Sequence, residues 1–123
     1  MKPVMAVLIS LGTLSWCLAM TPDAQRGRDA FEKTCTGCHV LDRGKVGPPL
    51  RNVFGRPAGK ENQFSYSDAM KGASVTWDEE TLDRWLTDTE SVIPGNDMSF
   101  RLNDASKRAD IIAYLKQLSG KRQ

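Results

Sequence analysis

The sequence predicts an all-α protein of roughly three to five helices, joined by loops that wrap around a central body. No run of alternating apolar and polar residues is long enough to indicate a strand, and no internal repeat or low-complexity tract is present. Glycine and proline recur between residues 40 and 60, which excludes a long regular element there. The helices carry too few apolar residues to form a core alone, so we expect a bound group to complete it.

Local signals place the first and the last helix. Asp23 suits the N-cap of a first helix that carries Gly27 and Phe31 on one face and ends near Cys35. The last helix is expected to run from residue 103 or 104 to residue 118, with Gly120 after its end. Its apolar residues are Ile111, Ile112, Tyr114, Leu115 and Leu118.

Two further helices are expected between these. A short helix is predicted at residues 67–71, and a longer one begins after Thr76. Residues 78–80 are acidic and fall in the first turn of the longer helix, where the helix dipole favours negative charge. Apolar side chains at positions 82, 85 and 86 form its core face, and we predict that it continues without a break until just before Pro94.

The amino-terminal residues have the pattern of an export signal. Lys2 is followed by an apolar stretch at residues 4–19, which is short for a membrane helix of about 20 apolar residues. We expect cleavage near Ala19, and therefore assign residues 1–20 to a signal peptide and residues 21–123 to a single domain. The alternative is an uncleaved anchor. The expected location is periplasmic, with membrane attachment only if the signal is retained.

The pair of cysteines beyond this signal carries the chemistry. Cys35, Cys38 and His39 form C-x-x-C-H, the pattern of a c-type haem attachment site. Two thiols on one helical turn can reach the two vinyl groups along one porphyrin edge, and the adjacent imidazole can then approach the iron. We therefore expect one haem c, bound covalently through Cys35 and Cys38. A disulfide between cysteines so close in sequence would add little stability.

Three other interpretations of the motif are weaker. A structural zinc site needs four Cys or His ligands, whereas the chain contains one histidine and, beyond the signal, only two cysteines. A thioredoxin-like redox pair is expected after a strand in a β and α alternation, which this sequence lacks. The third interpretation is a chance occurrence. Nucleic-acid binding is not expected, because the formal net charge is only +2.

Met98 is the best candidate for the second axial ligand of the iron, because His39 is the only histidine. Met98 lies in the loop at residues 93–100, where a proline and a glycine can turn the thioether inward. Met20 lies at the signal junction, and Met70 lacks a comparable turn. The alternative is that Met98 serves only as an apolar anchor of its loop.

From about residue 27 to residue 118 the sequence resembles class I cytochromes c of the mitochondrial type and their bacterial relatives. The matches, in order, are Gly27 with Phe31, C-x-x-C-H, Gly47-Pro48, Leu50, Phe54-Gly55-Arg56, Phe64-Ser65-Tyr66, Trp77, Ile93-Pro94-Gly95 with Met98 and Phe100, and Ile112-Ala113-Tyr114-Leu115. The resemblance implies the class I cytochrome c fold, with helices and loops around one covalent haem, and an electron carrier rather than an enzyme.

The resemblance also implies roles for individual residues. The Pro48 carbonyl would accept the ring N–H of His39, which orients the imidazole and raises its basicity. Arg56, Tyr66 and Trp77 would meet the haem propionates. Trp85 and Phe100 complete the set expected at the cofactor. The first and last helices would cross closely through Gly27, Phe31, Tyr114 and Leu115.

Five positions depart from the mitochondrial pattern. Met70 replaces the usual asparagine, Trp85 the usual tyrosine near the methionine ligand, and Thr89 the usual proline. An indole N–H only donates hydrogen bonds, so the polar surroundings of the methionine ligand must differ. Glu90 and Asp97 replace lysines that usually surround the exposed haem edge. We therefore expect weaker electrostatic steering of partners, with less dependence on salt.

These patterns predict a monomeric one-electron carrier in a bacterial respiratory or periplasmic chain. A thioether ligand and an apolar site favour ferrous iron, which predicts a positive reduction potential. The expected donor is a quinol-oxidising complex or a dehydrogenase, and the expected acceptor is a terminal oxidase. Two alternatives remain: a haem peroxidase or small-gas sensor, if Met98 dissociates readily, and a fixed cytochrome subunit of a larger dehydrogenase or oxidase.

Overall fold

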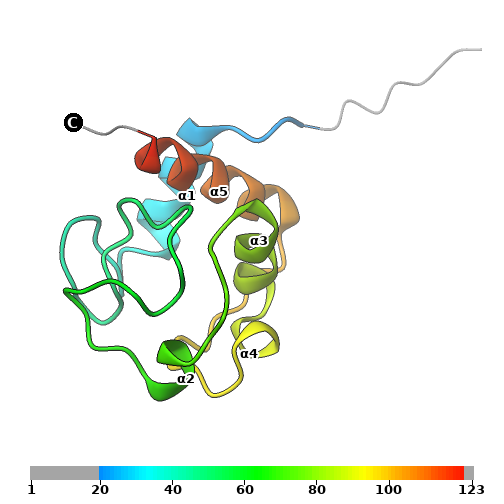
Figure 1. Ribbon diagram of the computed structural model, residues 1–123. Coiled ribbons are helices and arrows are strands. Elements are labelled where there is room, and N and C mark those ends of the chain that lie inside the picture. Colours follow the sequence, from blue (N-terminus) through cyan, green and yellow to red (C-terminus); the bar gives the residue numbers. More distant parts are fainter. Residues whose placement is uncertain (1–19, 121–123) are drawn as a thin grey trace, which may run out of the picture.

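The computed structural model describes residues 20–120, which form five helices joined by loops (Figure 1). The helices are α1 (Ala24–Thr34), α2 (Asp68–Lys71), α3 (Glu79–Thr87), α4 (Thr89–Val92) and α5 (Ala105–Ser119). Within this range the β contacts amount to an isolated bridge between Pro57 and Thr76, so the all-α prediction is confirmed. The predicted signal peptide lies, apart from Met20, outside the described residues. Among residues 20–120, no helix has the length and apolar character needed to cross a membrane.

The predicted helix starts are confirmed by side-chain caps. The Asp23 carboxylate accepts the backbone N–H of Arg26 at the start of α1, at 2.7 Å. Ser67 caps α2 through the N–H of Met70, and Asp104 caps α5 in the same way. Such caps satisfy backbone donors that the first helical turn leaves without an intrahelical partner.

The prediction of one helix that begins after Thr76 and stops before Pro94 was wrong, because the helix breaks at Asp88. This residue is extended, with φ −162° and ψ 104°, and its side chain accepts the N–H of Glu90 to start α4. The backbone N–H of Thr89 bonds to the carbonyl oxygen of Phe100 at 3.2 Å instead of to the preceding turn. A contact with a distant segment therefore overrides the helical pattern at this point.

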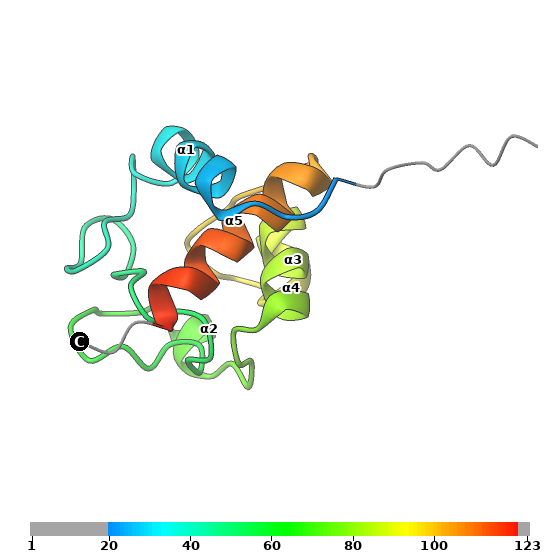
Figure 2. The same cartoon turned by 90° about the horizontal axis from the view of Figure 1, so that it is seen from above.

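Helices α1 and α5 cross at close range, and Figure 2 shows the crossing from above. A Cβ atom added to Gly27 would lie only 1.9 Å from the carbonyl oxygen of Asp110, so glycine is needed here. The rings of Phe31 and Tyr114 meet edge to face beside it, with centroids 5.4 Å apart. Arg26 forms an ion pair with Asp110 at 2.8 Å. The crossing predicted from the family resemblance is therefore confirmed.

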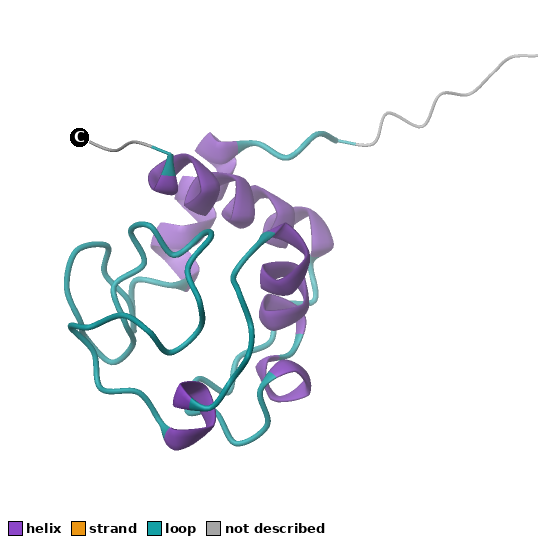
Figure 3. Cartoon of the chain, viewed as in Figure 1, coloured by secondary structure: helices purple, strands orange, loops and turns teal. Residues whose placement is uncertain are grey.

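The chain between α1 and α3 contains only the short helix α2 and runs mainly as loops (Figure 3). Backbone hydrogen bonds tie this segment together: Ala58 donates to Val75, and Trp77 donates to Arg56. The loops lie opposite α3, while α1 and α5 lie along a third side in Figure 1. This arrangement leaves the interior to be lined by residues from every part of the chain.

Candidate functional site

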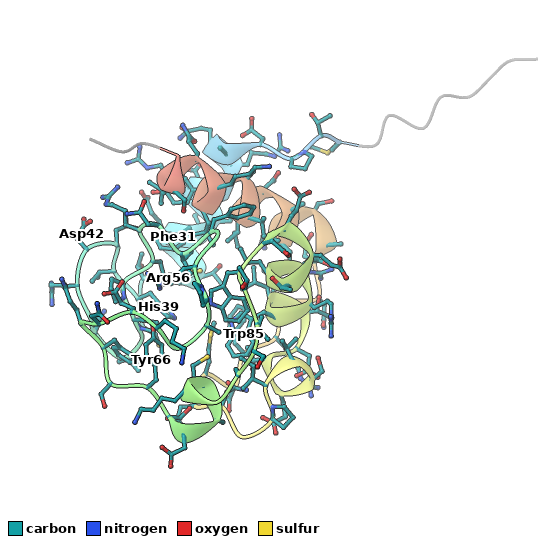
Figure 4. The ribbon with its side chains drawn as sticks, viewed as in Figure 1. Phe31, His39, Asp42, Arg56, Tyr66 and Trp85 are labelled. Carbon is teal, nitrogen blue, oxygen red and sulfur yellow. The ribbon has the colours of Figure 1, made fainter. Side chains whose placement is uncertain are left out.

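A cavity of about 380 Å³ lies between the loops and the helices. Small-molecule sites have volumes of about 300–1,000 Å³. In Figure 4, His39, Arg56 and Tyr66 come from the loop side of this region, whereas Trp85 comes from α3 on the other side. Every residue predicted to bind the cofactor lines the cavity: Cys35, Cys38, His39, Pro48, Arg56, Tyr66, Trp77, Trp85, Met98 and Phe100. The fold thus brings the whole predicted set together.

The cysteine motif continues from the end of α1. The N–H of Cys35 bonds to the carbonyl of Phe31 at 2.8 Å, and the N–H of His39 bonds to the carbonyl of Cys35 at 2.9 Å. These helical contacts hold both thiols and the imidazole beside one wall of the cavity. Burial raises the pKa of Cys35 to about 11. Burial therefore disfavours the thiolate form of Cys35.

The imidazole of His39 is buried and oriented by its neighbours. Its Nδ1 lies 2.9 Å from the carbonyl oxygen of Pro48, so Nδ1–H donates and Nε2 remains as the metal-binding nitrogen. Burial lowers the pKa of His39, although the bond to Pro48 acts in the opposite direction. A neutral imidazole is the form that ligates metal ions. This hydrogen bond is the one that the family resemblance implied.

Gly47 lines the cavity next to His39, although it was absent from the predicted site. A Cβ atom at this residue would lie 2.2 Å from Cε1 of His39, so any side chain here would displace the ring. The N–H of Gly47 also bonds to the carbonyl of Cys38 at 2.9 Å. The available sequence signal for Gly47 was its position directly before Pro48, whose carbonyl was expected to accept the His39 ring N–H.

Two methionines line the cavity. Met98 is half-buried on the loop after α4, and its N–H donates to the side chain of Asn96 at 2.9 Å. Met70 on α2 also lines the cavity, although its sequence context did not favour it as an iron ligand. Asn96 was also absent from the predicted site, since one polar residue in a loop carries no distinctive sequence signal.

The polar wall of the cavity centres on Arg56. Its guanidinium donates to Glu61 at 3.1 Å and to the carbonyl of Pro49 at 3.0 Å. Burial raises the pKa of Tyr66, and the positive charge of Arg56 opposes this shift. Arg56 therefore places a largely buried guanidinium, paired with Glu61, on the wall where the resemblance implies the haem propionates.

The residues of the cavity fit haem c. The lining includes two thiols, an imidazole nitrogen and a thioether, together with aromatic side chains such as Trp77 and Trp85, whose ring centroids are 5.1 Å apart. Within residues 20–120, no three side chains of the His, Cys, Asp and Glu types cluster as a metal site would require.

Comparison with known proteins identifies the family. The family profile described as Cytochrome c matches residues 24–119. The chain belongs to the cytochrome c family. Its fold is the class I cytochrome c fold, and its cofactor is a covalently bound haem c, for which Cys35 and Cys38 have the C-x-x-C-H spacing. Membership supports electron carriage between redox partners.

Three relatives illustrate the similarity. Cytochrome c of Chlamydomonas reinhardtii is 46% identical over 99 residues, which cover 77% of this chain and 88% of that protein. Cytochrome c2 of Blastochloris viridis is 41% identical over 105 residues, and this alignment covers 82% of each protein. The solved structure of cytochrome cH from Methylobacterium extorquens has a TM-score of 0.73 and 41% identity, covering 77% of this chain and 98% of the other.

Proposed function

We propose that this member of the cytochrome c family is a bacterial periplasmic one-electron carrier, with His39 and Met98 as axial ligands of the haem iron. The observation that carries the proposal is that both side chains line the same cavity as Cys35 and Cys38. Haem c supplies an iron that changes its oxidation state by one electron.

The protein holds the two axial donors differently. His39 extends from the turn that follows α1, with its Nδ1–H bonded to Pro48 and its ring in contact with Gly47. This support orients Nε2 and increases its basicity. Met98 comes from the loop after α4, far from His39 in the sequence, and its soft thioether sulfur favours ferrous iron. If His39 and Met98 both hold the iron, no coordination position would be left for a substrate, and we therefore infer that the protein is not an enzyme.

We propose a positive reduction potential. The walls of the cavity are mainly apolar and aromatic, and burial in such surroundings disfavours the additional positive charge of ferric iron. Each tenfold preference for ferrous over ferric iron corresponds to about 59 mV for a one-electron couple. Such a carrier would accept electrons from a quinol-oxidising complex or a periplasmic dehydrogenase and deliver them to a terminal oxidase.

The exposed rim of the cavity is the proposed place of electron exchange. Cys38 is exposed, Val46 is 72% exposed, and both line the cavity. Asp97 is also exposed and lines it, and Glu90 is exposed on α4. These two acidic residues dilute any positive docking surface, so we propose partner association that depends little on salt.

We propose export to the periplasm through the signal at residues 1–20, and a monomeric carrier that binds no nucleic acid. The similarity to a bacterial cytochrome c2 supports a bacterial electron-transfer chain. Attachment to the membrane would follow only from retention of the signal.

The test uses holoprotein from a host that attaches haem c. Optical redox titration should give a positive midpoint, and the ferric protein should show the absorption band of methionine-ligated iron. Met98→Ala should remove this band and lower the midpoint while haem stays attached.

Met70→Leu is the matched control, because it removes the other cavity methionine with little change in volume. This variant should keep the band. A band that persists in Met98→Ala, or a strongly negative midpoint in the unaltered protein, would overturn the proposal.

A further inference from the structure

The loop that carries Met98 has a backbone conformation that needs support. Gly95 has φ +79°, and Ser99, which bears a side chain, has φ +42°. A residue other than glycine stays in this left-handed region only where neighbouring contacts hold it there. The loop therefore depends on groups outside its own backbone.

Asn96 bridges the two halves of the loop from inside. Its side chain is buried, with 7% of its surface exposed. Oδ1 accepts the N–H of Met98 at 2.9 Å, and Nδ2 donates to the carbonyl oxygen of Ile93 at 2.8 Å. Oδ1 also accepts the N–H of Ser99 at 3.4 Å. Loss of this side chain would therefore leave the N–H groups of Met98 and Ser99 without this acceptor, whereas the Ile93 carbonyl would keep its bond from the backbone N–H of residue 96.

Glu90 holds the loop from α4. Its carboxylate oxygens accept the N–H of Gly95 at 3.0 and 3.1 Å, and Oε2 also accepts the side-chain amide of Asn96 at 3.4 Å. The side chain is exposed, so water competes for these bonds and each should contribute less than those of Asn96.

Thr89 ties the far end of the loop to the same helix. It is 1% exposed, its Oγ1 accepts the N–H of Phe100 at 3.0 Å, and its own N–H donates to the carbonyl of Phe100 at 3.2 Å. A proline at this position, as is usual in the mitochondrial pattern, would provide neither group. Both ends of the Met98 loop are therefore joined to the first turn of α4.

We propose that Asn96 and Glu90, supported by Thr89, are positioning residues that hold Met98 at the cavity and so close the iron to external ligands. This inference rests on the proposed function, because it takes Met98 as the axial ligand. Glu90 and Thr89 on α4 and Asn96 within the loop are called here the α4 clamp, and none of the three lines the cavity. The clamp favours the bound position of Met98 over an open position in which another ligand can enter.

The test measures imidazole binding to the ferric holoprotein. Binding is monitored through the loss of the methionine-to-iron absorption band. Asn96→Ala should raise the apparent imidazole affinity by about tenfold, since it removes one buried and one partly buried hydrogen bond within the loop. Glu90→Ala should raise it by about threefold, and Glu90→Gln, which keeps an acceptor for Gly95, by less. Glu80→Ala is the matched control, because Glu80 is an exposed glutamate in the first turn of α3.

A second control separates positioning from general stability. Asp110→Asn weakens the ion pair with Arg26 at the α1–α5 crossing, away from the Met98 loop. It should lower the urea midpoint without changing imidazole affinity. If Asp110→Asn raises the affinity as much as Glu90→Ala does, the clamp has no local effect and the inference is wrong.

The outcomes distinguish the two proposals. Absence of the methionine band in the unaltered protein would reject Met98 ligation, and with it the clamp. If the band is present but Asn96→Ala and Glu90→Ala bind imidazole no more tightly than Glu80→Ala, only the clamp is rejected. Should Asn96→Ala fail to accumulate, the two variants of exposed Glu90 decide the question, and equal affinities for Glu90→Gln and Glu90→Ala would reject the hydrogen-bond account.

Discussion

Replacement of Gly27 by alanine should destabilise the protein through the crossing of α1 and α5. The added Cβ would lie 1.9 Å from the carbonyl oxygen of Asp110 and 3.0 Å from Cβ of Tyr114. Since non-bonded atoms are most stable at about 3.5 Å, the helices would have to separate locally by about 1.5 Å. That movement would disturb the edge-to-face contact between Phe31 and Tyr114.

The expected loss is about 3 kcal/mol of unfolding free energy. Overpacking typically costs about 1–3 kcal/mol, and backbone atoms yield less readily than a flexible side chain, so the upper value applies. Disruption of the aromatic contact adds about 1 kcal/mol. The better helix propensity of alanine stabilises the folded state by about 1 kcal/mol and offsets this second loss.

Urea unfolding of the haem-loaded protein, followed by far-UV circular dichroism, measures this loss. With a slope of about 2 kcal/mol per molar urea, the midpoint of Gly27→Ala should fall by about 1.5 M. Gly72→Ala is the control, because its new Cβ would come no nearer than 3.4 Å to the carbonyl of Asp68. This variant should change stability by less than about 0.5 kcal/mol. Equal midpoints for Gly27→Ala and Gly72→Ala would refute the argument from steric overlap.

Three further predictions concern the site and the pH dependence of stability. Gly47→Ala should displace the His39 ring and weaken its iron ligation, which a changed Soret spectrum would report; an unchanged spectrum would contradict the contact at 2.2 Å from Cε1. Cys38→Ala should sharply reduce haem that resists acid–acetone extraction, and an unaltered covalent yield would count against attachment at this thiol. The hydrogen bond from Arg26 lowers the pKa of Asp110 below that of an unfolded aspartate, about 3.9. Its stabilising effect should therefore be complete above that value and disappear as the pH falls through the lowered native pKa, so Asp110→Asn should flatten the dependence of the urea midpoint on pH between about 5 and 2.

The break between α3 and α4 illustrates where sequence patterns fail. The apolar spacing after Thr76 continues past Asp88, and no glycine or proline marks an end there. The amide of Thr89 nevertheless bonds to Phe100, which lies 11 positions further along the chain. A hydrogen bond between segments separated by a loop leaves no periodic signal, so the break was not predictable from propensity.

The α4 clamp was hidden for a related reason. Glu90 and Thr89 were recognised only as departures from the mitochondrial pattern, with consequences expected for partner docking and for the surroundings of the methionine. Their bonds to Gly95 and Phe100 depend on the fold of the loop around Met98. Similarly, Met70 reaches the cavity because α2 is placed against the loop at Gly59, where a Cβ would lie 2.4 Å from the Met70 carbonyl.

Local sequence patterns predict the haem attachment and the ends of most helices. Attachment of haem to Cys35 and Cys38 requires a local spacing of two thiols, and the caps at Asp23 and Asp104 satisfy backbone groups within the next few residues. The placement of His39 and Met98 along one cavity, and the hydrogen bonds that support the Met98 loop, depend on how distant segments pack together. Those features join residues that are distant in sequence, and their energies arise only when the folded chain excludes water from the contacts between them.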